Sequence, residues 1–171
     1  EYKNRLVGTL SKAAGFSFDS EKTMASDVGG CLVTNDDELA DRARYIGQSR
    51  GAVFKPHYGR LHVDAGYAYR MPNCTAAVCL AQLEDIREQV AQRDRIARLL
   101  LKLLEEIPGI IPLQLPEYMN VYSCWMIGFR IDLEQFRCTT ESFAEQLECA
   151  GIPGAGMGQY YLMPEALVCL Q

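Results

Sequence analysis

The sequence predicts a mixed α/β protein that is built from two successive units. Two short apolar runs, residues 13–18 and 31–34, have the length and composition of buried strands. A longer stretch, residues 73–107, carries apolar side chains at helical spacing. After Pro108 and Gly109 the chain changes to proline-punctuated extended segments and a further helix, which is the pattern of a smaller α+β unit.

The composition is that of an ordinary globular chain. It has 171 residues, of which 49% are hydrophobic, and this is enough to form a real core. The net charge of −5 argues against a protein that binds nucleic acid or a membrane surface nonspecifically. No apolar run approaches the roughly 20 residues that a membrane-spanning helix needs. Nucleic acid and membrane are therefore not expected as partners.

The cysteines and histidines predict neither disulfides nor a metal site. The seven cysteines are Cys31, Cys74, Cys79, Cys124, Cys138, Cys149 and Cys169. Their number is odd, no two of them form a CxxC pair, and neither His57 nor His62 is spaced with a cysteine as in a zinc site. We expect reduced, mostly buried thiols and a cytoplasmic location.

The first unit is expected to begin with a turn or short edge strand over residues 1–12, followed by the strand at 13–18. A polar loop with Lys22 comes next, and Gly29 and Gly30 then open the second strand. A helix is predicted over residues 37–46, with Asp36 or Asp37 as its N-cap.

Residues 47–70 lack helical periodicity and are rich in aromatic and basic side chains, so they form either a plain surface loop or a binding loop.

The apolar pattern over residues 73–107 predicts a long helix. A continuous helix of this length would be about 50 Å long, so we expect it to bend or to join two units. Residues 121–131 are predicted as a strand and 140–150 as a helix that ends before Gly151. The glycine-rich segment that follows is interpreted as a connection.

Lys22 is the residue on which a functional interpretation depends. A lysine amine that loses its proton can attack a carbonyl and form a Schiff base. Ser17 ends the preceding strand, and the two glycines let the backbone turn into the next one. By itself this layout is weak, because most lysines in polar loops are ordinary solvated side chains.

Two separated segments resemble one known family. SFDSEK at residues 17–22, followed by the glycine pair and a strand, resembles the cofactor-lysine segment of the DegT/DnrJ/EryC1/StrS aminotransferases. HVDAGYAYR at residues 62–70, with Ala-Ala and Gln-Leu on the following helix, is similar to the second motif of that family. The resemblance is specific over residues 1–95 and only general over 110–158. It implies pyridoxal 5'-phosphate (PLP) as cofactor and the type I, aspartate aminotransferase-like fold, with a mixed, mainly parallel sheet.

The resemblance also implies roles for single residues. Lys22 matches the Schiff-base lysine, which also moves protons once substrate has displaced it. Ser17 matches the hydroxyl that hydrogen-bonds the PLP phosphate. Residues 66–70 match a segment that reaches into the neighbouring subunit, so a homodimer with a shared active site is expected.

Further roles and departures concern both motifs. Arg70 either supplies a phosphate contact or is a structural arginine, and Ala68 stands where many members place an asparagine. His62 and Tyr69 match positions near the substrate. Val28 stands where the family usually has an acid, which puts a substrate-placing role of that acid in doubt.

The resemblance suggests how the chain is organised. The acid that keeps the pyridine nitrogen protonated lies upstream in this family, before the region that matches this sequence. We therefore expect a piece of a longer polypeptide, with residues 1–90 as the end of the large PLP-binding domain. Residues 91–171 are then a linking helix and an incomplete small domain.

The function that the resemblance implies is transfer of an amino group from an amino acid, glutamate, to a keto sugar that is linked to a nucleotide. One alternative keeps the cofactor and takes a cyclitol ketone or an amino-shikimate-type precursor as the acceptor. A related sugar dehydratase is disfavoured, because that branch replaces the lysine with histidine. Another alternative is a non-catalytic or truncated relative that serves as a binding or dimerisation module.

Overall fold

The computed structural model describes residues 1–48, 53–55, 59–61 and 65–155. The chain divides into two compact units. The first comprises Glu1–Leu99 together with Gln114–Ile127, and the second comprises Leu100–Leu113 together with Gly128–Gln171. Each unit is described by itself.

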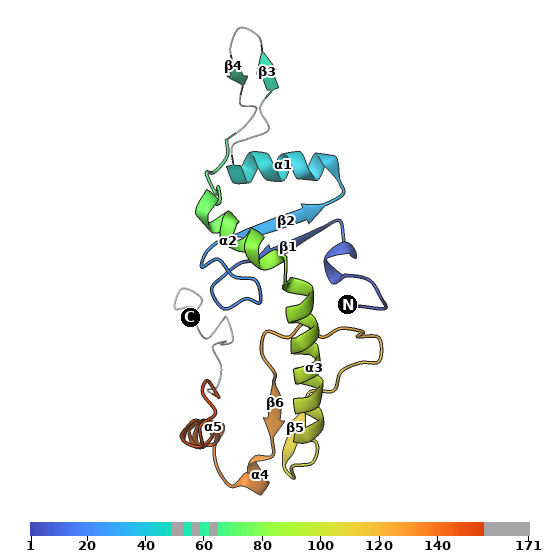
Figure 1. The fold of residues 1–171 in the computed structure, drawn as a ribbon, viewed down its shortest axis with the longest axis vertical. Coiled ribbons are helices and arrows are strands. Elements are labelled where there is room, and N and C mark those ends of the chain that lie inside the picture. Colours follow the sequence, from blue (N-terminus) through green and yellow to red (C-terminus); the bar gives the residue numbers. More distant parts are fainter. Residues whose placement is uncertain (49–52, 56–58, 62–64, 156–171) are drawn as a thin grey trace, which may run out of the picture. The chain divides into compact units, whose positions relative to one another are not determined.

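A β-hairpin forms the centre of the first unit (Figure 1). It follows a short 3-10 turn, η1 (Val7–Thr9), and consists of the antiparallel strands β1 (Ala13–Ser17) and β2 (Gly30–Thr34). Ala13 pairs with Thr34 at one end, and Ser17 pairs with Gly30 at the other. Both strands that the sequence predicts are therefore present, and the register places Ser17 where the loop with Lys22 begins.

The glycine pair is needed where the loop returns to the hairpin. Gly29 has a φ of +113°, a conformation that side chains disfavour. A Cβ atom at Gly30 would lie 2.5 Å from the carbonyl oxygen of Phe16 on the partner strand. The predicted turn at these glycines is thus confirmed.

Helix α1 (Asp37–Gln48) follows β2 and is capped as expected. The Asp36 carboxylate accepts a hydrogen bond from the backbone N–H of Leu39 at 3.0 Å. The extended segment that leads to the next helix binds the other end of α1, because the N–H groups of Tyr67 and Tyr69 donate to the carbonyls of Ile46 and Gly47, both at 2.7 Å. Between these segments, β3 (Val53–Lys55) and β4 (Gly59–Leu61) form a small antiparallel pair.

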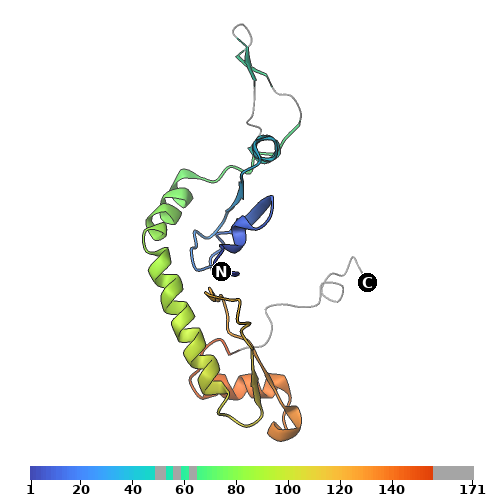
Figure 2. The same cartoon turned by 90° about the vertical axis from the view of Figure 1, so that its right-hand side faces the viewer.

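The long helical stretch of the sequence is two helices, α2 (Asn73–Leu83) and α3 (Ile86–Leu104), which meet at a turn at residues 84–85 (Figures 1 and 2). The expected bend is therefore confirmed as a break in the helix. The N–H of Asp85 donates to the carbonyl of Gln82 at 3.3 Å, a spacing tighter than that of an α-helix.

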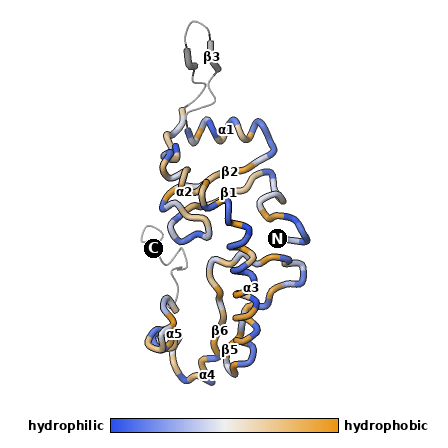
Figure 3. Tube along the Cα trace, in the orientation of Figure 1, coloured by the Kyte–Doolittle hydropathy of each residue, from blue (hydrophilic) through white to orange (hydrophobic). Residues whose placement is uncertain are grey.

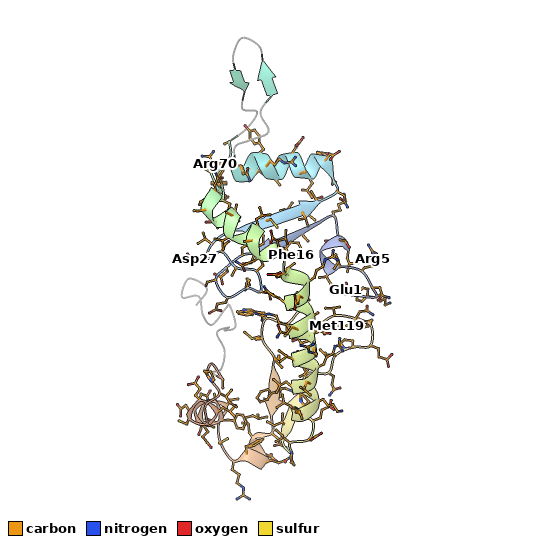
Figure 4. All side chains as sticks on the ribbon, in the orientation of Figure 1. Glu1, Arg5, Phe16, Asp27, Arg70 and Met119 are labelled. Atoms are coloured by element: carbon orange, nitrogen blue, oxygen red, sulfur yellow. The ribbon has the colours of Figure 1, made fainter. Side chains whose placement is uncertain are left out.

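Residues 114–127 pack in the first unit on α3 and on the N-terminal residues. The Glu1 ammonium donates to the carbonyl of Val121 at 2.8 Å, and Glu1 and Met119 lie close together in Figure 4. Asp94 of α3 accepts from the N–H of Tyr122 at 2.8 Å. The strand predicted at 121–131 is wrong over its first eight residues. At the start of this segment the backbone binds the N-terminus and the Asp94 side chain.

The second unit contains the remaining elements. Strand β5 (Ile110–Pro112) pairs with β6 (Phe129–Ile131), and α4 (Leu133–Phe136) and α5 (Thr140–Cys149) follow. The ring of Phe143 on α5 contacts the rings of Phe129 and Phe136, with centroid distances of 6.4 and 4.9 Å. Gly151 follows α5 with a φ of +93°, so the predicted end of this helix is confirmed.

Two expectations are not met in the part of the chain that the structure describes. All three strand pairs there are antiparallel, so the mainly parallel sheet is not seen within these residues.

The second expectation concerns the thiols, which were expected to be mostly buried. Of the six described cysteines, only Cys79 and Cys124 are buried, and all six are free. Many apolar residues of β2 and α3 are also exposed. Figure 3 shows how widely the hydrophobic positions are spread along the chain. Among the described helices, none has the length and hydrophobicity to cross a membrane.

Candidate functional site: the Lys22 loop

Lys22 lies on the loop that joins β1 to β2. The loop is closed at its base, where the N–H of Phe18 donates to the carbonyl of Gly29 at 3.0 Å and the N–H of Ser26 donates to the carbonyl of Phe18 at 2.8 Å. Lys22 closes a tight turn, because its own N–H donates to the carbonyl of Asp19 at 3.0 Å. The sequence thus places the amine on a short, hydrogen-bonded loop at the end of a hairpin.

Ser17 is the last residue of β1 and lies at the start of this loop. Its side chain is exposed, and its Oγ accepts one hydrogen bond, from the N–H of Asp19 at 3.3 Å. Asp19 links the hydroxyl to the lysine, because its carbonyl accepts from Lys22. A serine hydroxyl has one hydrogen to donate, and no described residue accepts it, so Ser17 has a donor for an anionic ligand.

Gln82 of α2 binds the middle of the loop. The N–H of Ala25 donates to Gln82 Oε1 at 3.0 Å, and Gln82 Nε2 donates to the carbonyl of Ala25 at 2.5 Å. One carboxamide therefore pairs with both polar groups of one loop residue. This contact joins the helix that follows the second motif to the loop that carries Lys22.

Trp125 contacts the amine itself. Lys22 Nζ lies over the Trp125 ring, 4.2 Å from its centroid, and both side chains are half-buried. This is a cation–π contact, and tryptophan is the best ring for it. Residues 119–122, just before Trp125, are held by α3, because Arg98 donates to the carbonyl of Met119 at 3.1 Å and its Nε donates to Asp94 at 2.9 Å.

A groove of about 620 Å³ lies on the first unit beside Trp125. It is lined by Gln89, Gln92, Arg93, Ile96, Cys124, Trp125, Met126 and Ile127. Three of its four residues on α3 are polar and include Arg93, whereas the residues on its other side are largely apolar. Trp125 therefore borders the groove and also contacts the lysine.

The hairpin carries one thiol, that of Cys31. Partial loss of hydration raises the pKa of this thiol, and the nearby Cys79 raises it further. A thiol is a strong nucleophile only as the thiolate, so this shift makes Cys31 a weaker nucleophile.

The other predicted site residues are less closely connected to this loop. Arg70 is exposed, and no described residue forms a hydrogen bond or ion pair with its guanidinium. The ring of Tyr69 stacks on that of Tyr67, with centroids 5.0 Å apart, and is 72% exposed. His62 lies outside the described residues. Val28 is exposed, and the acid before it, Asp27, has a left-handed backbone with φ +71°.

Sequence reasoning missed Trp125 and Gln82 as parts of this site. Trp125 fell in a segment that was interpreted as a strand, and nothing in its neighbourhood pointed to Lys22. Gln82 was noted as part of the family pattern but without a role. The available signal was weak: Trp125 is the single tryptophan of the chain.

Known proteins are similar to this chain in sequence and in structure. The GDP-perosamine synthase of Caulobacter vibrioides is 30% identical over 151 residues, which are 88% of this chain and 40% of that protein. The GDP-perosamine synthase of Escherichia coli O157:H7 is 36% identical over 128 residues, which are 75% of this chain and 34% of that protein. The chain therefore spans about 40% or less of the length of these curated relatives.

A solved structure confirms the type of fold. The crystal structure of 3-amino-5-hydroxybenzoic acid synthase matches with a TM-score of 0.75 and 29% identity, over 90% of this chain and 40% of that chain. The mixed α/β, aminotransferase-like fold expected from the sequence is thus confirmed. The sequence profile of the DegT/DnrJ/EryC1/StrS aminotransferase family matches residues 1–166. The chain belongs to the DegT/DnrJ/EryC1/StrS aminotransferase family.

Proposed function

We propose that the protein is a PLP-dependent aminotransferase that moves an amino group from an amino acid, glutamate, to a keto sugar linked to a nucleotide. The observation that carries the proposal is the placement of Lys22 in this family member. Its amine lies on a loop that is closed at its base and bound by Gln82, with a serine hydroxyl at the start of the same loop.

The side chains of this loop suit the cofactor. PLP needs an amine that reaches its aldehyde and donors for its phosphate. Lys22 is half-buried, and the Ser17 hydroxyl has a hydrogen left to donate. When bound, PLP supplies an electron sink for the carbon that loses its proton.

The chain's own residues then have separate tasks. Lys22 Nζ would hold the cofactor covalently and, when the amino donor takes its place, would move a proton between the carbon and nitrogen atoms of the reacting group. Ser17 would donate to the phosphate and so fix one end of the cofactor. The Trp125 ring would keep the Lys22 amine close to the site while it carries that proton, because the ring face attracts a positive charge.

The acceptor is proposed from the relatives. Two of them are named GDP-perosamine synthases, which favours a nucleotide-linked keto sugar. The likeness to 3-amino-5-hydroxybenzoic acid synthase favours a second candidate, a cyclitol ketone or amino-shikimate-type acceptor. A screen of both acceptor classes with glutamate, measuring 2-oxoglutarate, distinguishes them.

We also propose a cytoplasmic homodimer in which Arg70 contacts the phosphate in the neighbouring site. Its exposed guanidinium at the end of an extended segment supports this role (Figure 4). Variants Lys22→Ala and Arg70→Ala are each expected to be inactive. Mixing them is expected to restore about a quarter of the activity, because mixed dimers contain one intact site. Absence of any recovery in a verified mixed dimer contradicts the shared site.

The cofactor assignment is tested directly on the intact protein. After incubation with PLP and reduction with borohydride, peptide mass spectrometry is expected to find the cofactor on Lys22. Lys22→Ala is expected to lose the adduct, whereas Lys12→Ala, at an exposed lysine before β1, is expected to keep it. An adduct that persists in Lys22→Ala, or wild-type protein without one, refutes the proposal.

A further inference from the structure

The Gln82 side chain makes an unusual contact with the Lys22 loop. It pairs with the N–H and the carbonyl of Ala25, at 3.0 and 2.5 Å, in the way that neighbouring strands pair. Its Nε2 also lies 3.4 Å from the carbonyl of Val78, one turn earlier in α2. These bonds orient the carboxamide, so the loop is held by a side chain that is itself fixed on a helix.

The position of this contact in the loop gives it its importance. The bonds at Phe18, Ser26 and Gly29 close the base of the loop, and the Asp19–Lys22 turn is local. The segment from Lys22 to Ala25 leads directly from the amine to the residue that Gln82 holds. The two bonds hold the peptide groups on both sides of Ala25 and so restrict the position and the rotation of this residue, which a single bond does not do.

The contact depends on the carboxamide of Gln82. A carboxamide carries a donor and an acceptor side by side, so it can pair with the carbonyl and the N–H of one residue. Glutamate at this position keeps the acceptor for the Ala25 N–H but turns a negative oxygen toward the Ala25 carbonyl. Methionine has a similar length and removes both bonds.

We propose that Gln82 is a positioning residue for the cofactor lysine: through Ala25 it holds the Lys22 loop at the place where the amine attacks the aldehyde. Gln82 itself does not contact the reacting atoms. The inference rests on the proposed function, since it assigns Gln82 a task in the attachment of PLP to Lys22.

A purely structural tie has different consequences from a positioning role. If Gln82 only stabilises the fold, its loss changes the midpoint of unfolding and leaves the rate of cofactor attachment in the folded protein unchanged. If Gln82 positions Lys22, attachment slows in protein that is fully folded, because the amine is displaced from its line of attack.

The experiment compares Gln82→Met and Gln82→Glu with the wild type in the intact protein. The control is Gln146→Met, since Gln146 is also a helical glutamine but forms one exposed hydrogen bond, to Ser142 of α5. Hydrogen exchange at the Ala25 amide reports the contact, and the rate of PLP attachment at limiting PLP reports its effect. The absorbance maximum of the attached cofactor is a third measurement.

Gln82→Met is expected to accelerate exchange at Ala25 by about ten- to a hundred-fold, because two hydrogen bonds are lost. PLP attachment is expected to slow by at least about ten-fold. Gln82→Glu keeps the Ala25 N–H bonded, so its rates of Ala25 exchange and of PLP attachment are expected to lie between those of Gln82→Met and the wild type. Gln146→Met is expected to have the wild-type rates.

Attachment at the wild-type rate in Gln82→Met overturns the positioning role, and so does an equal loss in Gln146→Met. If Gln82→Met does not fold, the same comparison is made with Gln82→Glu, where a wild-type attachment rate overturns the role. Wild-type protein that attaches no PLP at Lys22 refutes the proposed function itself. The Ala25 exchange rate is measured before PLP is added, so these two failures are distinguishable.

Discussion

The amine of Lys22 lies 4.2 Å from the centroid of the Trp125 ring, although the two residues are far apart in the sequence. Trp125 belongs to residues 114–127, which return to the first unit after the chain has passed through part of the second. Asp94 and Arg98 of α3 hold the backbone just before it. The ring is therefore presented to the lysine by a segment with its own fixed support.

Replacing this ring is expected to change the reactivity of Lys22 without unfolding the protein. A cation–π contact contributes about 0.5–2 kcal/mol and holds the charged amine on the ring, which the amine must leave to attack the aldehyde, so Trp125→Leu is expected to speed PLP attachment to Lys22 by about two- to thirty-fold. Trp125→Phe keeps an aromatic face and is expected to lie between Trp125→Leu and the wild type. The measurement is the growth of cofactor absorbance after mixing with PLP. Equal rates in Trp125→Leu and the wild type would show that the contact has no influence on the amine.

Ser17 is expected to determine how tightly the cofactor is held. A hydrogen bond to a charged group contributes about 1.5–3 kcal/mol, so Ser17→Ala is expected to raise the dissociation constant of PLP on the order of ten- to a hundred-fold. Ser20→Ala changes an exposed serine of the same loop and serves as the control. Dialysis against buffer, followed by absorbance, measures the retained cofactor. A similar loss in both variants would assign the effect to the loop as a whole.

Gly30 is expected to tolerate no side chain, whereas Gly15 on the partner strand tolerates one. A Cβ atom at Gly30 meets the Phe16 carbonyl oxygen at 2.5 Å, but nothing lies within 4 Å of a Cβ atom at Gly15. Gly30→Ala is expected to lower the free energy of unfolding by about 1–3 kcal/mol. Gly15→Ala is expected to leave it nearly unchanged, as measured by urea unfolding. Equal stabilities of the two variants would contradict the close approach of the strands.

The cap of α4 is expected to weaken in acid. The side chain of Gln135 and the backbone N–H groups of Gln135 and Glu134 donate to the Asp132 carboxylate and lower its pKa below the usual 3.8. Because the pKa is lower in the folded state, the contribution to stability is present above pH 3.8 and is lost as the pH falls through the folded-state pKa.

Asp132→Ala is therefore expected to lower the free energy of unfolding at neutral pH. Below about pH 4, this free energy is expected to fall less steeply in the variant than in the wild type. Asp132→Asn still caps the helix but does not titrate, so its curve is expected to flatten with a smaller loss at neutral pH. Urea unfolding between pH 7 and pH 3 measures both. An Asp132→Ala curve parallel to that of the wild type would rule out this carboxylate as a source of the acid sensitivity.

Local features of the fold were predictable because their causes lie within a few residues. Asp36 caps α1 through the N–H of Leu39, and Gly29 and Gly151 adopt positive φ angles at the turn and the helix end where the sequence placed them. By contrast, residues 121–128 have the composition of a strand but form none. At the start of this segment the backbone binds Asp94 of α3 and the N-terminal ammonium, which are far away in the sequence.

The candidate site divides in the same way. The roles of Lys22, Ser17 and Arg70 were suggested by the motifs of the family and remain predictions about this chain. The contacts of Lys22 with Trp125 and of Ala25 with Gln82 were not predictable, since no periodicity or spacing relates these residues. They became visible only when the packing of the first unit was known.

The sequence by itself determined the order of the elements, the caps and glycine turns, the family, and the lysine with its serine on one loop. These depend on local backbone preferences and on motifs that can be read in a single stretch of chain. Only the tertiary structure decided what surrounds that loop: the Trp125 ring over the amine and the Gln82 carboxamide on Ala25. Such contacts depend on where distant segments pack, and this is set by the burial and hydrogen bonding of the whole unit.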